Sequence, residues 1–170
     1  LRYFREREAA PTFYLSPACT PKTLDERLVA RGFSRQPADE AWMVLPDLPN
    51  VDTPPPSPDV TVRPIERDEA PVFARVFLKA FDMPAEFAPP FVQLLQPTVG
   101  LENAWHCLAF DGDRPIGTCS LLTHGSYGIL GSAGIVRSRR ARGAATTMTV
   151  AAIAEGRRRG VTPLTPQTTP

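Results

Sequence analysis

The stretch RRARGAATTMTVAAIAEG, residues 139 to 156, places three arginines and a glycine directly before an alanine-rich segment. The apolar residues of this segment are spaced by three and four, which predicts a helix from Gly143 to Gly156 or Gly160. The N–H groups in the first turn of a helix lack an intrahelical partner and lie at the positive end of the helix dipole. Because such an end attracts phosphate and glycine lets a ligand come close, the stretch predicts a phosphate site. The alternative interpretation is a solvent-exposed basic turn.

The segments around this helix have the patterns of strands and of two further helices. The residues on either side of DGD, 111 to 113, give the strongest hairpin signal in the chain. This order predicts a mixed α/β protein, an α+β arrangement around a mixed sheet, rather than a repeating βαβ array. The predicted elements after residue 59 are a strand (60–66), two helices (67–81 and 84–96), a hairpin (104–110 with 114–122), a strand (128–136), the helix described above and a weak strand (161–167).

Proline density sets the clearest boundary in the chain. PNVDTPPPSPDV, residues 49 to 60, excludes helix and central strand, so residues 49–59 are expected to form a stiff, extended linker. Before it, residues 11–17 and 41–48 are typical of strands, and residues 20–33 are typical of a helix that ends at Gly32. Fewer than about 50 residues bury little by themselves. We therefore expect residues 1–48 to pack on the second part.

Composition limits the classes of partner. The 170 residues carry 19 basic and 18 acidic side chains, a net charge of +1, which gives no general reason to expect nucleic acid or an anionic membrane. No run of about 18 apolar residues lacks a charge, so no transmembrane helix is expected. Cys19, Cys107 and Cys119 lack the paired spacing of a zinc site, so no metal is expected, and no apolar signal segment precedes them. A reducing cytoplasm is the expected location, with Cys107 and Cys119 as buried neighbours across the hairpin.

The loop before the last predicted helix also carries a family signature. The spacing of Arg140, Gly143 and Ala145 resembles the Q/R-x-x-G-x-G/A motif of the GNAT superfamily of N-acetyltransferases. The resemblance extends over about residues 60 to 170, because the strands and helices on both sides follow in that family's order. It implies a GNAT-like acyl-CoA N-acyltransferase fold, acetyl-CoA as cosubstrate, and transfer of the acetyl group to an amine. The acceptor would be a small molecule or a protein, and the sequence does not define the oligomeric state.

The resemblance also bears on the ends of the chain. The family's last helix and the strand after it would follow Pro170, so the expected fold is C-terminally incomplete. Residues 1–48 look like the terminal strand, helix and strand of the same family. We therefore expect a piece of a tandem protein: a C-terminal remnant of a first unit, the linker, and an acetyltransferase domain at 60–170 that lacks its last elements.

The same resemblance implies the residues that hold the cosubstrate. The loop and first helical turn would hold its pyrophosphate, and backbone groups at the end of the preceding strand would pair with its pantetheine arm. The cosubstrate-binding residues expected are Ala133, Gly134, Ile135, Arg140, Ala141, Arg142, Gly143, Ala144, Ala145 and Thr146.

The group that removes the amine proton is not identified by any motif. Glu102, His106 and His124 are the candidates, since a carboxylate or an imidazole can accept a proton near neutral pH. Two other functions stay open. One is a catalytically inactive GNAT-like unit that binds acyl-CoA or acts as a scaffold. The other is an arginine-rich nucleic-acid-binding module, which the near-neutral charge and the lack of interleaved aromatic residues disfavour.

Overall fold

The computed structural model describes residues 4, 6, 8, 10–13, 15, 19–35 and 41–168. The chain divides into two compact units, Leu1–Asp39 and Glu40–Pro170. Residues 41–59, which include the proline-rich segment, therefore lie in the second unit. The assignment of the two parts as pieces of tandem domains stays a prediction.

The first unit contains the short helix α2 (Leu24–Val29). Gly32 has a φ of 87°, and the N–H of Phe33 returns to the carbonyl of Leu28, so the helix ends at the glycine as the sequence predicts. The strand predicted at 11–17 is not found in its described residues, 11–13 and 15. The rest of that segment lies outside the described residues.

The second unit is built on a six-stranded mixed sheet with the order β1-β6-β5-β4-β3-β2. All neighbouring strands are antiparallel except β5 and β6, which are parallel. This confirms the predicted mixed sheet. The strands are β1 (Ala41–Trp42), β2 (Val60–Pro64), β3 (Ala104–Asp111), β4 (Arg114–His124), β5 (Tyr127–Ile135) and β6 (Leu164–Thr168).

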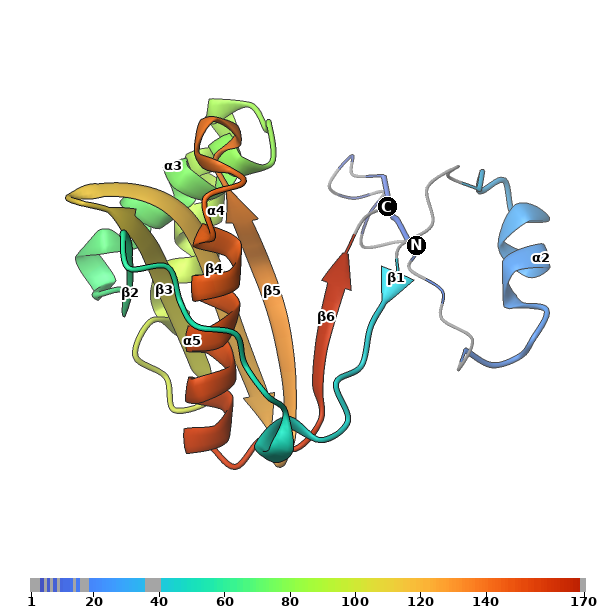
Figure 1. Ribbon diagram of the computed structural model, residues 1–170. Coiled ribbons are helices and arrows are strands. Elements are labelled where there is room, and N and C mark those ends of the chain that lie inside the picture. Colours follow the sequence, from blue (N-terminus) through green and yellow to red (C-terminus); the bar gives the residue numbers. More distant parts are fainter. Residues whose placement is uncertain are drawn as a thin grey trace. The chain divides into compact units, whose positions relative to one another are not determined.

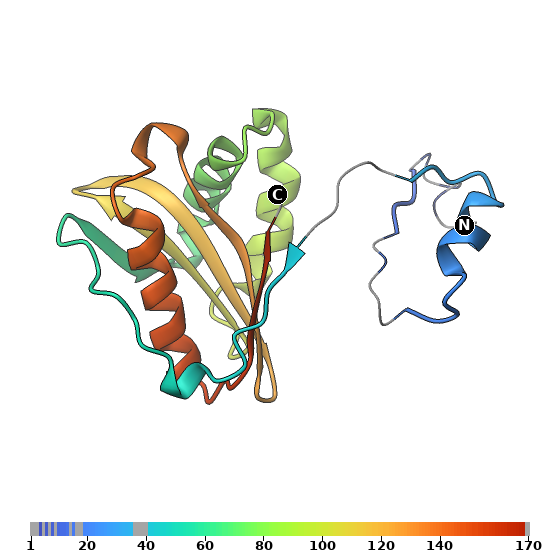
Figure 2. The same cartoon turned by 45° about the vertical axis from the view of Figure 1, so that its right-hand side comes forward.

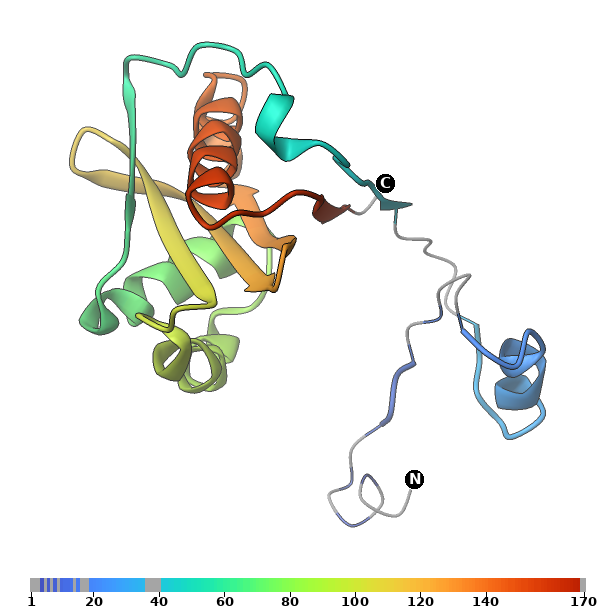
Figure 3. The ribbon, with the colours of Figure 1, turned by 90° about the horizontal axis from the view of Figure 1, so that it is seen from below.

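Helices cover the two faces of this sheet. Helix α5 (Ala144–Arg158) packs on one face, while α3 (Ala70–Ala80) and α4 (Ala88–Leu95) lie on the other, as the view from below shows (Figure 3). Short 3₁₀ turns flank these elements: η1 (Leu48–Asn50), η2 (Arg67–Glu69), η3 (Ala85–Phe87), η4 (Gln96–Thr98) and η5 (Arg137–Arg139). In the part of the chain that the structure describes, no helix is long and apolar enough to span a membrane.

The β3–β4 hairpin forms at the predicted turn, where Gly112 has a φ of 58°. Cys107 and Cys119 are direct register partners on this hairpin and are both buried, as predicted. A hydrogen bond that the Cys107 thiol makes to Cys119, together with burial, raises the pKa of Cys107. Cys107 therefore remains a protonated core group.

The segment before β2 is anchored in the core at its start and is mostly exposed beyond it. Leu48 is fully buried, and a Cβ on Gly156 of α5 would lie only 2.8 Å from Leu48 Cδ2. Arg157 donates to the carbonyls of Leu48 and Val51. Of the strand predicted at 41–48, only Ala41–Trp42 and a bridge at Leu45 pair with β6. The residues up to 59 then cross the outer side of α5 without regular structure (Figures 1 and 2).

Candidate functional site

The parallel pair β5 and β6 separates soon after it forms. Only Gly128, Ile129 and Leu130 of β5 pair with β6. Beyond Leu130 the strands spread apart (Figure 1), so in the described part of the unit no strand pairs with this edge of β5. On this side, the backbone groups at 131–135 that make no other hydrogen bond are therefore available to an extended ligand. This segment contains the three predicted strand residues, Ala133, Gly134 and Ile135.

A β-bulge lies at the same place. Thr118 of β4 pairs with Gly134, whereas Ser120 pairs with Gly131, so β5 holds one extra residue between these pairs. Ser132 has a φ of 51°, which is rare outside glycine, and its carbonyl accepts a hydrogen bond from Thr118 Oγ1 at 2.8 Å. Bulges bend a strand and interrupt its pairing. The bulge thus helps to turn β5 away from β6 where the two strands separate.

The loop that follows β5 leads into α5 with two residues in the left-handed region. Ala141 and Gly143 have φ values of 61° and 77°. Among the described residues, no protein group accepts a hydrogen bond from the N–H groups of residues 141–146. Alternating backbone conformations of this kind form concave sets of N–H donors that bind anions. The start of α5 therefore has the unpaired amides that the predicted phosphate site requires, and phosphate binding itself stays a prediction.

One side of this helix start is covered by protein. A Cβ on Gly143 would lie 3.1 Å from Ser57 Cβ, and the N–H of Ser57 donates to Thr147 Oγ1 at 2.8 Å. The Thr147 hydroxyl also donates to the Gly143 carbonyl. Ser57 does not accept a hydrogen bond from the unpaired amides, so those donors stay available. The side chains of Ala145 and Thr146 are exposed, while Ala144 is buried.

Arg140 bonds to the backbone on both sides of the loop. Its Nε donates to the carbonyl of Ile135 at 3.1 Å, and its Nη2 donates to the carbonyl of Ala80 at 2.9 Å. The side chain therefore ties the end of β5 to the end of α3. Its expected contact with a diphosphate stays a prediction, and holding the loop in place is a role that the sequence did not reveal.

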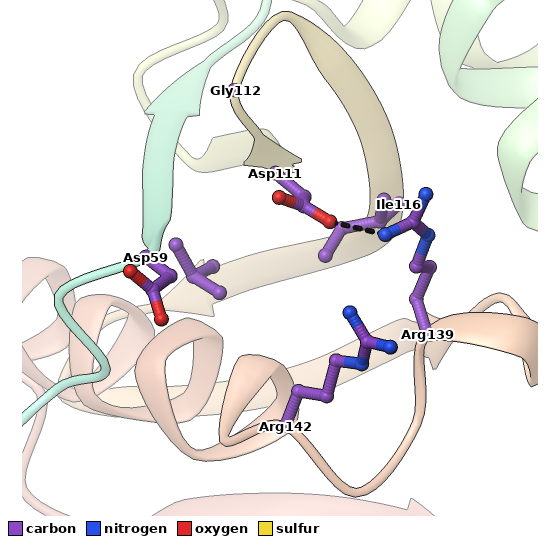
Figure 4. A pocket seen from close by; sticks show the side chains of 7 residues that line it. Asp59, Asp111, Gly112, Ile116, Arg139 and Arg142 are labelled. Carbon is purple, nitrogen blue, oxygen red and sulfur yellow. Dashed lines mark hydrogen bonds and ion pairs between the residues drawn. The ribbon is translucent and has the colours of Figure 1, made fainter.

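A second group of charges lies beside the loop. Arg139 pairs with Asp111 at 2.6 Å, and the guanidinium of Arg142 points into the same pocket (Figure 4). The pocket has a volume of about 330 Å³ and is also bordered by Asp59 and Gly112. Arg142 is exposed and makes no ion pair with a described residue. It is thus a cation beside the unpaired amides that is free to approach an anionic ligand.

Other arginines near the two ends of α5 form ion pairs within the protein. Arg137 pairs with Asp82, and Arg158 and Arg159 both pair with Glu155. These ion pairs lower the pKa of the Glu155 carboxyl. Each of these three arginines thus has a carboxylate partner in the protein.

The three candidate proton acceptors are not brought together. Glu102 is exposed in the turn before β3, and His124 is exposed at the end of β4. His106 is buried in the middle of the sheet, where its ring contacts Thr98, Ser120 and the edge of the Phe73 ring. In the described residues, no group of three or more His, Cys, Asp or Glu side chains could hold a metal ion.

Comparisons with known proteins bear on this arrangement. No protein-family model matches the sequence, and no curated protein matches it either. Many solved structures do. A GCN5-related N-acetyltransferase from Sphaerobacter thermophilus has a TM-score of 0.66 at 21% identity, over 89% of this chain and 49% of that chain. The chain has the GNAT fold.

Two further structures share the GNAT fold with this chain. A predicted acetyltransferase from Clostridium acetobutylicum, solved with acetyl-CoA, has a TM-score of 0.53 at 11% identity, over 62% of this chain and 78% of that chain. An aminoglycoside acetyltransferase from an uncultured soil metagenomic sample has a TM-score of 0.52 at 15% identity, over 60% of this chain and 74% of that chain. The likeness concerns the fold, and the chain spans about half the length of the Sphaerobacter protein.

Proposed function

We propose that this GNAT fold binds acetyl-CoA and transfers the acetyl group to an amine. The observation that carries the proposal is the run of unpaired amides at 141–146, which directly follows the unpaired edge of β5 at 131–135. The first feature suits a pyrophosphate and the second suits an extended arm with amide groups. The unpaired strand edge and the unpaired amides are neighbours along the chain, just as the pantetheine arm and the pyrophosphate are neighbours in coenzyme A.

The residues present fit such a ligand. Gly143 has no side chain to block the amides, and Ala141, Ala144 and Ala145 have only methyl groups. Arg142 adds a positive charge beside the amides, which suits a charge-assisted contact with phosphate. The pantetheine arm would run along Ala133, Gly134 and Ile135 toward the bulge at Ser132.

The reaction then depends mainly on positioning. The amine nitrogen attacks the thioester carbonyl carbon, and a backbone N–H of β5 stabilises the negative charge that develops on the carbonyl oxygen. The C–S bond breaks, the amide forms, and the proton lost by the amine balances the proton gained by the thiolate. The protein supplies the fixed donors and must supply a proton acceptor.

The surroundings favour an amine attached to an apolar body. Leu122 and Ile129 are direct register partners on β4 and β5, on the face of the sheet that α3 and α4 leave partly uncovered. They are 46% and 47% exposed, next to the point where β5 and β6 separate. An acceptor lying there would bury apolar surface, while its amine reaches the start of the unpaired edge.

The test is calorimetric titration of the 170-residue chain with acetyl-CoA, followed by measurement of free CoA thiol released in the presence of amines. The panel contains an aminoglycoside, an aromatic alkylamine and a lysine peptide. We expect binding, and thiol release that depends on one amine class. Binding without release across the panel would instead support an inactive acyl-CoA-binding unit. Absence of binding would overturn the proposal.

A further inference from the structure

Three polar or small residues form one row across the sheet. His106 of β3 is the register partner of Ser120 of β4, and Ser120 is the register partner of Gly131 of β5. Residues directly opposite one another point to the same face. The edge contact between Phe73 of α3 and the His106 ring shows that this is the face covered by α3. The row therefore connects the core to β5 on that face.

The outer end of the row reaches open space. Gly131 follows Leu130, the last residue of β5 that pairs with β6. A Cβ added at Gly131 would meet no atom within 4 Å. Ser120 is 5% exposed and lies directly beside this space. The hydroxyl group thus stands next to the place where the strands separate and where the proposed acetyl group would lie.

The donor and the acceptor of each hydrogen bond in the row can be assigned. Thr98 Oγ1 donates to the carbonyl of Leu95 at 2.6 Å. Since a hydroxyl has one proton, Thr98 Oγ1 must accept from His106 Nε2, which lies 2.9 Å away. The proton of the neutral ring is therefore on Nε2, and Nδ1 accepts from Ser120 Oγ at 2.8 Å. This network assigns the tautomer: the basic nitrogen of His106 faces Ser120.

We propose that Ser120 accepts the proton of the attacking amine while passing its own proton to Nδ1 of His106. This assignment rests on the acetyl transfer proposed above. As the nitrogen bonds to the carbonyl carbon, its proton moves to Ser120 Oγ and the Ser120 proton moves to Nδ1. When the C–S bond breaks, the same path returns one proton to the CoA thiolate, so the pair is restored. Thr98 orients the ring through Nε2.

The environment keeps the ring able to accept a proton. Burial lowers the pKa of His106, so the ring is neutral at pH 7. The elements packed against it present uncharged groups: Phe73 from α3, Thr98 from η4 and Ser120 from β4. Three charged residues, Glu102, Arg158 and Arg159, border a pocket of about 300 Å³ that His106 also borders.

The other two candidate acceptors are less suitably placed. Glu102 lies in the turn before β3, and its carbonyl accepts a hydrogen bond from Arg159. His124 is four residues beyond Ser120 on β4, opposite the exposed Tyr127 at the paired end of β5. The row through Ser120 is therefore the arrangement that brings a basic nitrogen to the opening at Gly131.

The test is the pH dependence of kcat/KM for the amine that the wild-type protein acetylates. The wild-type rate should fall as the pH drops through the pKa of His106, because a protonated ring accepts no proton. That pKa is measured independently by NMR titration of the His106 ring. Ser120→Ala and His106→Gln should each lower kcat by about 100-fold, leave the KM for acetyl-CoA unchanged and remove this acidic limb. Ser120→Thr keeps a hydroxyl and should retain the limb.

The outcomes are distinguishable. Absence of acetyl-CoA binding by the wild-type protein overturns the proposed function and this assignment with it. If Ser120→Ala keeps the wild-type turnover and the acidic limb, the assignment of Ser120 is overturned while the proposed function stands. That result would be expected of a hydroxyl with only a structural role. If Ser120→Ala fails to fold, the wild-type comparison decides: a kinetic pKa that differs from the NMR pKa of His106 overturns the assignment.

Discussion

The N–H of Ser57 donates to Thr147 Oγ1 at 2.8 Å, which fixes the proline-rich segment against the first turn of α5. Thr147 is 6% exposed and also donates to the carbonyl of Gly143. One hydroxyl group thus joins residues 90 positions apart and holds the glycine of the proposed pyrophosphate site.

Replacing Thr147 should therefore destabilise the second unit. Thr147→Ala leaves the Ser57 N–H and the Gly143 carbonyl without this partner, and we expect a loss of about 1–3 kcal/mol in the free energy of unfolding. Urea denaturation measures it. Thr149→Ala is the control, because Thr149 is exposed on the same helix. Equal stability of the two variants would contradict the role assigned to the Ser57 contact.

Gly143 permits a test of charge at the proposed pyrophosphate site. Its φ is 77°, a region where Asn and Asp are tolerated better than other side chains. Gly143→Asp and Gly143→Asn have similar shapes and share the close approach to Ser57, but only Asp adds a negative charge. We expect Asp to weaken acetyl-CoA binding by at least about 30-fold relative to Asn, because its carboxylate would lie directly beside the anionic diphosphate.

The control for this pair is Gly160, which has a φ of 72° and lies just after the other end of α5 with no atom within 4 Å of an added Cβ. Gly160→Asp and Gly160→Asn should bind acetyl-CoA alike. Calorimetry gives the four affinities. If Gly143→Asp binds as tightly as Gly143→Asn, the amides at 141–146 do not hold the diphosphate.

Much of the fold could be predicted from local patterns. The alternation of residues around Gly112 and the helical spacing after Gly143 place β3, β4 and α5 close to their observed bounds. The unpaired amides at 141–146 could also be expected from sequence, because the first N–H groups of any helix lack an intrahelical partner. These features depend on neighbours in the chain.

The parts that could not be predicted depend on contacts between distant residues. The tautomer of His106 is set by Thr98 and Ser120, which come from a 3₁₀ turn and another strand. The bulge at Ser132 requires Thr118 as a hydrogen-bond donor. Leu48 precedes a proline-rich segment and gave no sign of packing under α5. Such partners are chosen by tertiary packing, which sequence spacing alone does not determine.

Arg140 should be more important for loop position than for charge. Its two bonds, to the carbonyls of Ile135 and Ala80, require the fork of a guanidinium, which lysine lacks. We expect Arg140→Lys to lower the free energy of unfolding by about 2 kcal/mol and to weaken acetyl-CoA binding by about tenfold. Arg142→Lys, which keeps an exposed cation, should leave stability unchanged. Chemical denaturation and calorimetry separate the effects, and unaltered stability of Arg140→Lys would show that the two carbonyl contacts contribute little.

Leu48 and Gly156 should be coupled energetically. A methyl group on Gly156 would lie 2.8 Å from Leu48 Cδ2, and Leu48 is fully buried, so it has little room to move. Overpacking of this kind costs about 1–3 kcal/mol, which outweighs the gain of about 1 kcal/mol in helix propensity. Gly156→Ala should therefore destabilise the unit, and Leu48→Ala alone should cost about 2–5 kcal/mol by leaving a cavity.

The double variant tests the contact directly. In Leu48→Ala with Gly156→Ala, the new methyl group occupies part of the cavity, so the combined loss should be smaller than the sum of the two single losses by at least about 1 kcal/mol. Chemical denaturation of the wild type, the two single variants and the double variant gives the four free energies of unfolding that the comparison needs. A parallel cycle of Leu48→Ala with Thr149→Ala should be additive, because Thr149 is exposed on α5. Additivity in the first cycle would mean that Leu48 does not pack against residue 156 of α5.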